Sequence, residues 1–122
     1  MEVSIAELLD RLSICKLKVE RIGEPHLKLE VEELEKAIEE YKDKGINIKE
    51  EWLVELYKIN GITWDLESDI RKGKEGILGL EEVGRRAILI RENNKKRISL
   101  KNKIIEETKI GFKDVKMNHG SE

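Results

Sequence analysis

Apolar residues recur along most of this chain at alternating intervals of three and four, the spacing that places side chains on one face of an α-helix. The pattern is interrupted at Gly23, at Gly45 and over residues 72–79, where turns are expected. The pattern predicts an all-α fold, an antiparallel four-helix bundle in a single domain over residues 1–122. The expected helices cover about residues 5–22, 25–44, 48–72 and 80–109, and we expect the tail over residues 110–122 to dock on the bundle through Phe112, Val115 and Met117.

The first three predicted helices each carry a continuous apolar stripe, which we expect to form the core. The stripes are Ile5, Leu8, Leu12, Cys15, Val19 and Ile22 in the first, Leu27, Val31, Leu34, Ile38 and Tyr41 in the second, and Trp52, Leu56, Ile59, Thr63, Leu66 and Ile70 in the third. Ser4 and Glu7 have the spacing of a capping box, which predicts where the first helix begins. Gly61 weakens the interior of the third helix by roughly 1 kcal/mol relative to Ala, and it is compatible with a kink or a close helix crossing.

The fourth predicted helix differs because polar residues fall among its core-facing apolar residues. The apolar set is Val83, Ala87, Ile90, Ile98, Ile104 and Ile105, and the polar residues at neighbouring angles are Arg91, Asn94 and Lys101. Buried cations need carboxylates or another anion opposite them. Glu67 and Glu20, on the shoulders of the third and first stripes, are the carboxylates we expect there.

This polar set has three interpretations. It can be a network of ion pairs that sets the register of the helices, or a pocket inside the bundle for a phosphate-containing small molecule. Alternatively, Arg91 and Lys101 can extend along the apolar surface to water. The candidate ligand-binding residues are accordingly Arg91, Asn94, Lys101, Glu67 and Glu20.

Charge is unevenly distributed, although the net charge of −2 selects no class of partner. Residues 24–55 hold 11 acidic and 5 basic side chains, a net charge of −6, whereas residues 85–116 hold 11 basic and 4 acidic, a net charge of +7. We expect these segments to face each other within the fold or across a dimer, although a basic face could also meet phosphates. Together with the wide apolar faces of the first and third helices and the off-stripe Trp64, this predicts a homodimer.

One acidic segment resembles part of a known metal site. All-helical nucleotide pyrophosphohydrolases of the MazG type carry Glu-Glu-x-x-Glu and a later Glu-x-x-Asp, which converge on Mg²⁺. Glu39-Glu40-Tyr-Lys-Asp43 is similar to the first motif, but Asp65-Leu-Glu67-Ser-Asp69 has the wrong spacing for the second. A MazG-like relative therefore stays an alternative.

The remaining residues with chemical potential form no recognisable constellation. His26 and His119 have no partner at metal-ligand spacing, and Cys15 has the position of a small buried apolar residue. We therefore expect no catalytic residue, no metal ligand and no cofactor. Nucleic-acid binding is not favoured, because the basic positions Arg85, Arg86, Lys95, Lys96, Arg97 and Lys103 have no aromatic residues among them and match no known motif.

Neither a signal pattern nor an apolar run of about 20 residues occurs, so we expect a cytoplasmic protein that does not span a membrane. Charged residues make up 41% of the chain and aromatic residues 4%, a composition typical of long amphipathic helices. Its richness in Lys and Glu and its lack of Gln also fit a thermophile or a low-GC genome.

Several segments resemble a group of small bacterial helical proteins that carry a domain-of-unknown-function label. These segments, in the same order, are ELLDRLSI (7–14), KVERI (18–22), WDLE (64–67) and RENNKKRISLK (91–101). The resemblance implies an all-helical fold and no particular activity. The sequence thus favours a non-enzymatic interaction or assembly module, with a phosphate- or nucleotide-binding bundle as the alternative.

Overall fold

The computed structural model describes residues 4–71 and 79–109, and every regular element within them is an α-helix. The helices are α1 (Ile5–Arg21), α2 (His26–Asp43), α3 (Glu50–Arg71) and α5 (Leu80–Thr108). The predicted all-α fold is confirmed, and each helix begins and ends within two residues of its predicted bounds. The expected docking of the tail concerns residues 110–122, which lie outside the described part of the chain.

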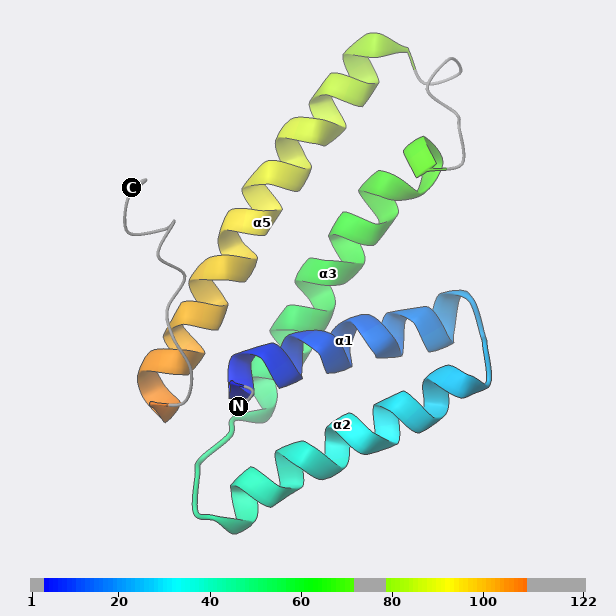
Figure 1. The fold of residues 1–122 in the computed structure, drawn as a ribbon. Helices are drawn as coiled ribbons and strands as arrows, with labels where there is room; N and C mark the ends of the chain where they lie inside the picture. Colours follow the sequence, from blue (N-terminus) through cyan, green and yellow to red (C-terminus); the bar gives the residue numbers. More distant parts are fainter. Residues whose placement is uncertain (1–3, 72–78, 110–122) are drawn as a thin grey trace.

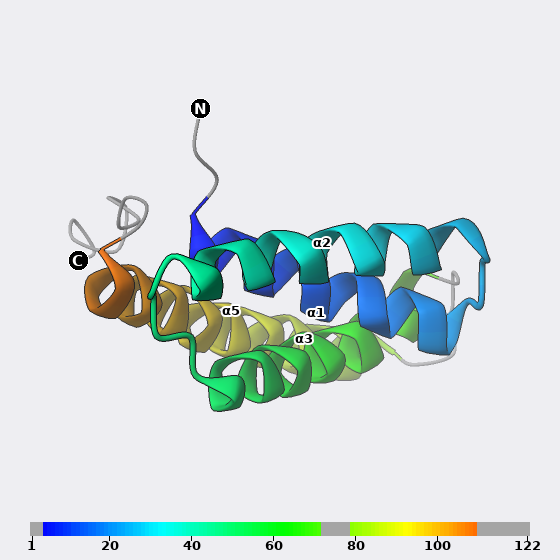
Figure 2. The ribbon, with the colours of Figure 1, turned by 90° about the horizontal axis from the view of Figure 1, so that it is seen from below.

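The four helices form two antiparallel hairpins that pack on each other in two layers. The α1–α2 hairpin lies across one part of the α3–α5 hairpin, so the other end of the α3–α5 hairpin extends beyond it (Figure 1). The view from below separates the two layers (Figure 2). α1 lies in the middle and packs against all three other helices, whereas α2 packs chiefly against α1.

The start and the end of α1 both follow from local chemistry. The Ser4 hydroxyl accepts a hydrogen bond from the amide of Glu7 at 3.0 Å, which satisfies one of the free donors of the first turn. At the other end, Gly23 adopts a positive φ of 78°, and its amide donates to the carbonyl of Lys18 at 3.1 Å. Glycine adopts this left-handed conformation without steric cost, so the chain can turn immediately into α2.

The hydrophobic core lies where all four helices meet. Its buried members are Ile5, Ala6, Leu8, Leu9 and Leu12 of α1, Ile38 of α2, Trp52 and Leu56 of α3, and Ile104 and Ile105 of α5. Most of the predicted stripe residues of α1 are buried, but Ile22, which follows the helix, is exposed. Ile22 was expected in the core because it continues the spacing, yet it lies at the opposite end of α1 from the residues that form the core.

We expect Gly61→Ala to stabilise the protein by about 0.5–1 kcal/mol. Gly61 lies inside α3, which continues through it, and a methyl group added there would meet Leu17 at 3.6 Å, an ordinary van der Waals distance. The helix gains propensity and no neighbour has to move. Urea unfolding of the two proteins measures the difference, and a loss of stability would show that the crossing of α1 and α3 requires glycine.

Candidate functional site

A cluster of polar side chains lies between α1, α3 and α5, centred on Asp10. The side chain of Asp10 is 1% exposed. Its carboxylate accepts hydrogen bonds from both ends of the Arg97 guanidinium, through Nε at 3.0 Å and through Nη2. It also accepts from Nδ2 of Asn60 at 3.0 Å. Asn60 donates to the hydroxyl of Ser13 at 2.7 Å, and this hydroxyl donates to the backbone carbonyl of Asp10 at 2.7 Å.

Lys101 extends the cluster along α5. Its ammonium lies 2.8 Å from the carboxylate of Glu7 and 3.6 Å from that of Asp10. Two carboxylates and two cations therefore meet here, and the exposed Arg11 also approaches the carboxylate of Glu7, at 3.6 Å. Burial raises the pKa of Asp10, but the hydrogen bonds from Arg97 and Asn60 and the charges of Arg97 and Lys101 outweigh burial, so the pKa lies below its ordinary value.

The interface between α3 and α5 is also polar beyond this cluster. Nδ2 of Asn93 donates to the carbonyl of Ile59 at 2.5 Å and to the hydroxyl of Thr63 at 2.7 Å. Two turns nearer the start of α5, Nη1 of Arg86 donates to the backbone carbonyl of Leu66 of α3 at 3.4 Å. Asn93 and Arg86 of α5 thus meet acceptors of α3 at defined heights along the bundle. A shift of α5 by one turn would separate these pairs, so the polar contacts set its register.

The periodicity of two helices brings these residues together. In α5, Arg86, Asn93, Arg97, Lys101 and Ile104 follow one another at intervals of seven, four, four and three, so they share one face. In α1, the buried residues Ala6, Asp10, Ser13 and Leu17 follow at intervals of four, three and four. They form a second stripe beside the apolar one, because α1 is enclosed by helices on more than one side.

The structure does not gather the five predicted ligand-binding residues. Lys101 lies in the cluster, but its carboxylate partners are Glu7 and Asp10 instead of the expected Glu20 and Glu67. Glu20 is exposed on α1, where it accepts a hydrogen bond from the hydroxyl of Tyr57. Glu67 lies half-buried on α3.

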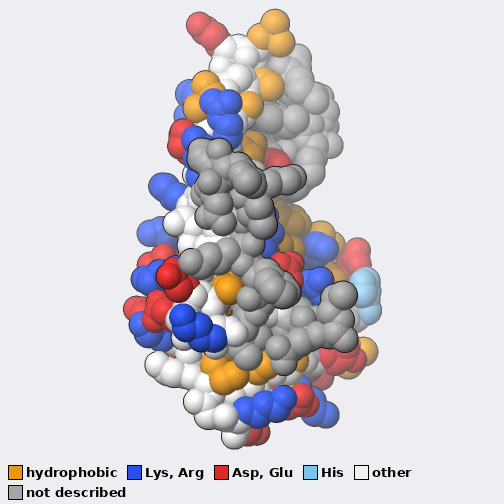
Figure 3. Space-filling model, turned by 60° about the vertical axis from the view of Figure 1, so that its left-hand side comes forward, with side chains coloured by type: hydrophobic (Ala, Val, Ile, Leu, Met, Phe, Trp, Pro, Cys, Tyr) orange, Lys and Arg blue, Asp and Glu red, His pale blue; other side chains and the backbone are white. Residues whose placement is uncertain are grey.

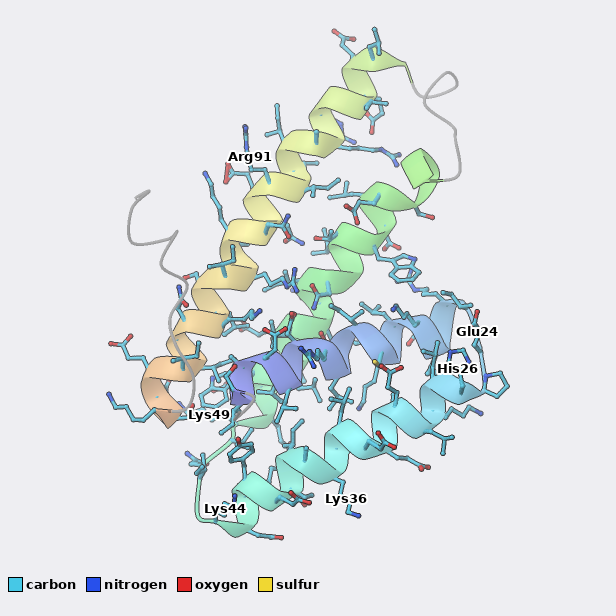
Figure 4. The ribbon with its side chains drawn as sticks, in the orientation of Figure 1. Glu24, His26, Lys36, Lys44, Lys49 and Arg91 are labelled. Atoms are coloured by element: carbon cyan, nitrogen blue, oxygen red, sulfur yellow. The ribbon has the colours of Figure 1, made fainter. Side chains whose placement is uncertain are left out.

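Arg91 and Asn94 complete the predicted set. Arg91 is exposed and points away from the other helices, and Asn94 is half-buried (Figure 4). Arg91 is six residues from Arg97, which is about 120° around the helix. That five-residue set as an anion site stays a prediction, and a thermal-shift assay with nucleotides, compared with Arg91→Ala, tests it.

The sequence did not indicate Asp10, Asn60 or Asn93 as members of a site. Arg97 was named only among the basic positions considered for nucleic-acid binding, which is not favoured. Apolar residues alone indicated the inner face of α5, but two positions near the middle of that face, Asn93 and Arg97, are polar. The apolar residues lie at the edges of this face. The face predicted from them alone was therefore centred too close to Arg91. A search for polar residues at helical spacing would have found the row from Arg86 to Lys101.

A second feature is a set of large apolar side chains on the surface of the α3–α5 hairpin. Ile62 of α3 is 44% exposed, and Ile88 and Leu89 of α5 are 53% and 40% exposed. Apolar side chains are visible toward the top of the molecule in Figure 3, at the end of the hairpin that extends beyond α1 and α2. Ile88 and Leu89 are consecutive on α5, and contiguous exposed apolar area typically marks an interaction site.

Within the described ranges, 4–71 and 79–109, no group of three or more His, Cys, Asp and Glu residues has an arrangement that could hold a metal ion. The acidic residues Glu39, Glu40 and Asp43 of the MazG-like segment are exposed on α2. In these same ranges, no helix combines the length and the hydropathy that a membrane span requires.

Comparison of the chain with protein-family models, with curated proteins and with solved structures found no match.

Proposed function

We propose that this protein is a non-enzymatic helical interaction and assembly module that forms a homodimer. The observation that carries the proposal is the exposure of large apolar side chains on the α3–α5 hairpin, namely Ile62, Leu80, Ile88 and Leu89. The α1–α2 hairpin does not extend over this end of the molecule (Figure 1). A second copy that covered these side chains would remove their apolar area from water, at about 25 cal/mol per Å².

The distribution of charge supports association. α2 carries seven acidic and three basic side chains, whereas α5 carries eight basic and five acidic ones. α2 packs chiefly against α1, so the fold does not place these two helices against each other along their length. At the end of the acidic segment, Glu55 of α3 lines the same hollow as Lys95, Lys96 and Lys103 of α5. Complementarity between copies therefore concerns the acidic residues of α2, which does not pack along α5.

The polar cluster supports a role in packing for the interior of the bundle. The carboxylates of Glu7 and Asp10 are opposite the cations of Arg97 and Lys101, so an anionic ligand would have to displace carboxylates that are already bound. If this cluster serves the packing of the helices, partners of the protein bind at its outer surface.

We expect the double substitution Ile88→Gln and Leu89→Gln to dissociate the homodimer. Both side chains are exposed, so the variant should fold, and glutamine leaves the charge of α5 unchanged. Sedimentation equilibrium at micromolar concentration should give about twice the 14.2 kDa chain mass for the wild-type protein and a single chain mass for the variant.

The matched control is Leu29→Gln, which removes an exposed apolar side chain from α2 and should leave the mass unchanged. A wild-type mass of one 14.2 kDa chain would end the homodimer proposal. Equal dissociation by the control would move the interface to α2.

A further inference from the structure

A groove runs between α2 and α3. Two adjoining hollows, of about 680 and 450 Å³, follow one another along it, and both are lined by Leu53 and Val54 of α3. α1 contributes side chains from Leu9 to Glu20 between the two walls. The groove exists because α2 packs chiefly on α1 and leaves α3 uncovered on this side.

The length of the groove matches a short helix. On α2 its lining residues extend from Lys28 to Lys42, which at 1.5 Å per residue is about 21 Å, or four helical turns. Apolar side chains line it throughout, among them Val19, Val31 and Leu53. Val54, on the α3 wall, is 66% exposed and would be covered by an occupant.

The α2 wall of the groove is acidic in its middle. Glu32, Glu35 and Glu39 follow one another at intervals of three and four, so they form a row on one side of α2. The ammonium of Lys16 lies 3.8 Å from the carboxylate of Glu35, and the ammonium of Lys42 lies 3.8 Å from that of Glu39. Lys49, at the far end, is held by Glu107 of α5 at 2.9 Å. Four lysines and five glutamates line the groove in all, and within the described residues Glu32 is the member of the α2 row that has no ion pair. The α2 flank around Glu32 is therefore the part of the rim that complements a positive charge of a partner.

We propose that this groove binds an amphipathic α-helix of a partner protein. The helix would be about four turns long, with an apolar face directed at Leu53 and Val54 and with Lys or Arg residues beside Glu32 and Glu39. An α-helix satisfies its own backbone hydrogen bonds, so it can enter an apolar groove that offers few backbone partners. The inference rests on the proposed role as an interaction module but requires no homodimer.

Two synthetic peptides of about 16 residues test the proposal, since this length covers the four turns of the groove. Both carry the same leucine stripe on a helical sequence and a fluorescent label. One has Lys on its polar flanks and the other has Glu. Fluorescence anisotropy with the full chain should show that the Lys peptide binds at least tenfold more tightly than the Glu peptide.

Variants of the chain separate the apolar and the charged contributions. Val54→Asp should weaken the binding of both peptides at least tenfold, whereas Leu29→Asp, an equally exposed apolar position on the outer side of α2, should change neither. The double substitution Glu32→Lys and Glu39→Lys should reverse the preference, so that the Glu peptide binds more tightly. Circular dichroism confirms that each variant is folded.

Three results would overturn the proposal. One is an absence of binding by either peptide up to about 0.1 mM, the weak end of specific recognition. Another is unchanged binding to Val54→Asp. The third is a fall of the sedimentation mass from two chains to one as peptide is added, which would make a second copy the occupant of the groove. Failure of the peptides on a chain that still dimerises would leave the homodimer intact.

Discussion

Asp10→Asn should lower the free energy of unfolding by about 3 kcal/mol, as expected for a buried ion pair that loses one partner. Asp10 is 1% exposed, and its carboxylate holds the guanidinium of Arg97 on one side and Asn60 on the other. The substitution keeps the shape and an acceptor oxygen but removes the charge that compensates Arg97 and, in part, Lys101. Because Arg97 retains some access to water, we place the loss near the lower end of the range of about 3–5 kcal/mol.

Urea unfolding at neutral pH measures this loss, and Asp65→Asn is its control. Asp65 also pairs with an arginine, Arg21, at 2.5 Å, but its side chain is 62% exposed. An exposed pair contributes about 0–1 kcal/mol, so this variant should remain close to the wild type. Equal losses from the two variants would show that the Asp10 cluster contributes no more than a surface ion pair.

The pH dependence of the same comparison follows from the lowered pKa of Asp10. In the unfolded chain the carboxyl has its ordinary pKa of 3.8, and in the folded chain its pKa is lower. The stabilisation from Asp10 is thus fully present above the unfolded pKa and is lost as the pH falls through the folded pKa. The difference in stability between the wild type and Asp10→Asn should be constant near neutral pH and should shrink below about pH 4. A difference that grows on acidification would contradict this assignment.

Leu56→Ala should cost about 3 kcal/mol, and we expect a fall in melting temperature of about 12 °C for a domain of this size. Leu56 is fully buried in the core where the helices meet. Truncation removes apolar contacts and leaves a cavity that the surrounding helices can only partly fill. Thermal unfolding, followed by the circular dichroism signal of the helices at about 222 nm, measures the change in melting temperature.

Val54→Ala provides the matched control on the same helix. Val54 is two residues away and faces the groove, where it is largely exposed, so its truncation should change stability by no more than about 0.5 kcal/mol. Loss of comparable stability in Val54→Ala would show that the groove is closed in solution.

The sequence by itself determined the four helices and most of their core positions. Helix formation depends on local terms, namely the spacing of apolar residues, the cap at Ser4 and the turn at Gly23, and all of these can be read within a few residues of the chain. Three stripes also place residues such as Leu8, Leu12 and Leu56 correctly in the core. The spacing of apolar residues in the last helix also indicated that polar residues share its inner side, and Lys101 is one of them.

Only the tertiary structure decided which polar residues meet. The partners of Asp10 are 50 and 87 positions away in the chain, and no local pattern specifies how α5 is rotated toward α1. The inner face of α5 has the buried Asn93 and the half-buried Arg97 near its middle, and hydrogen-bond acceptors on α3 and α1 lie opposite them. Hydrophobicity alone cannot locate such a face. Its position depends on the pairing of charges across helices, which exists only once the helices have packed.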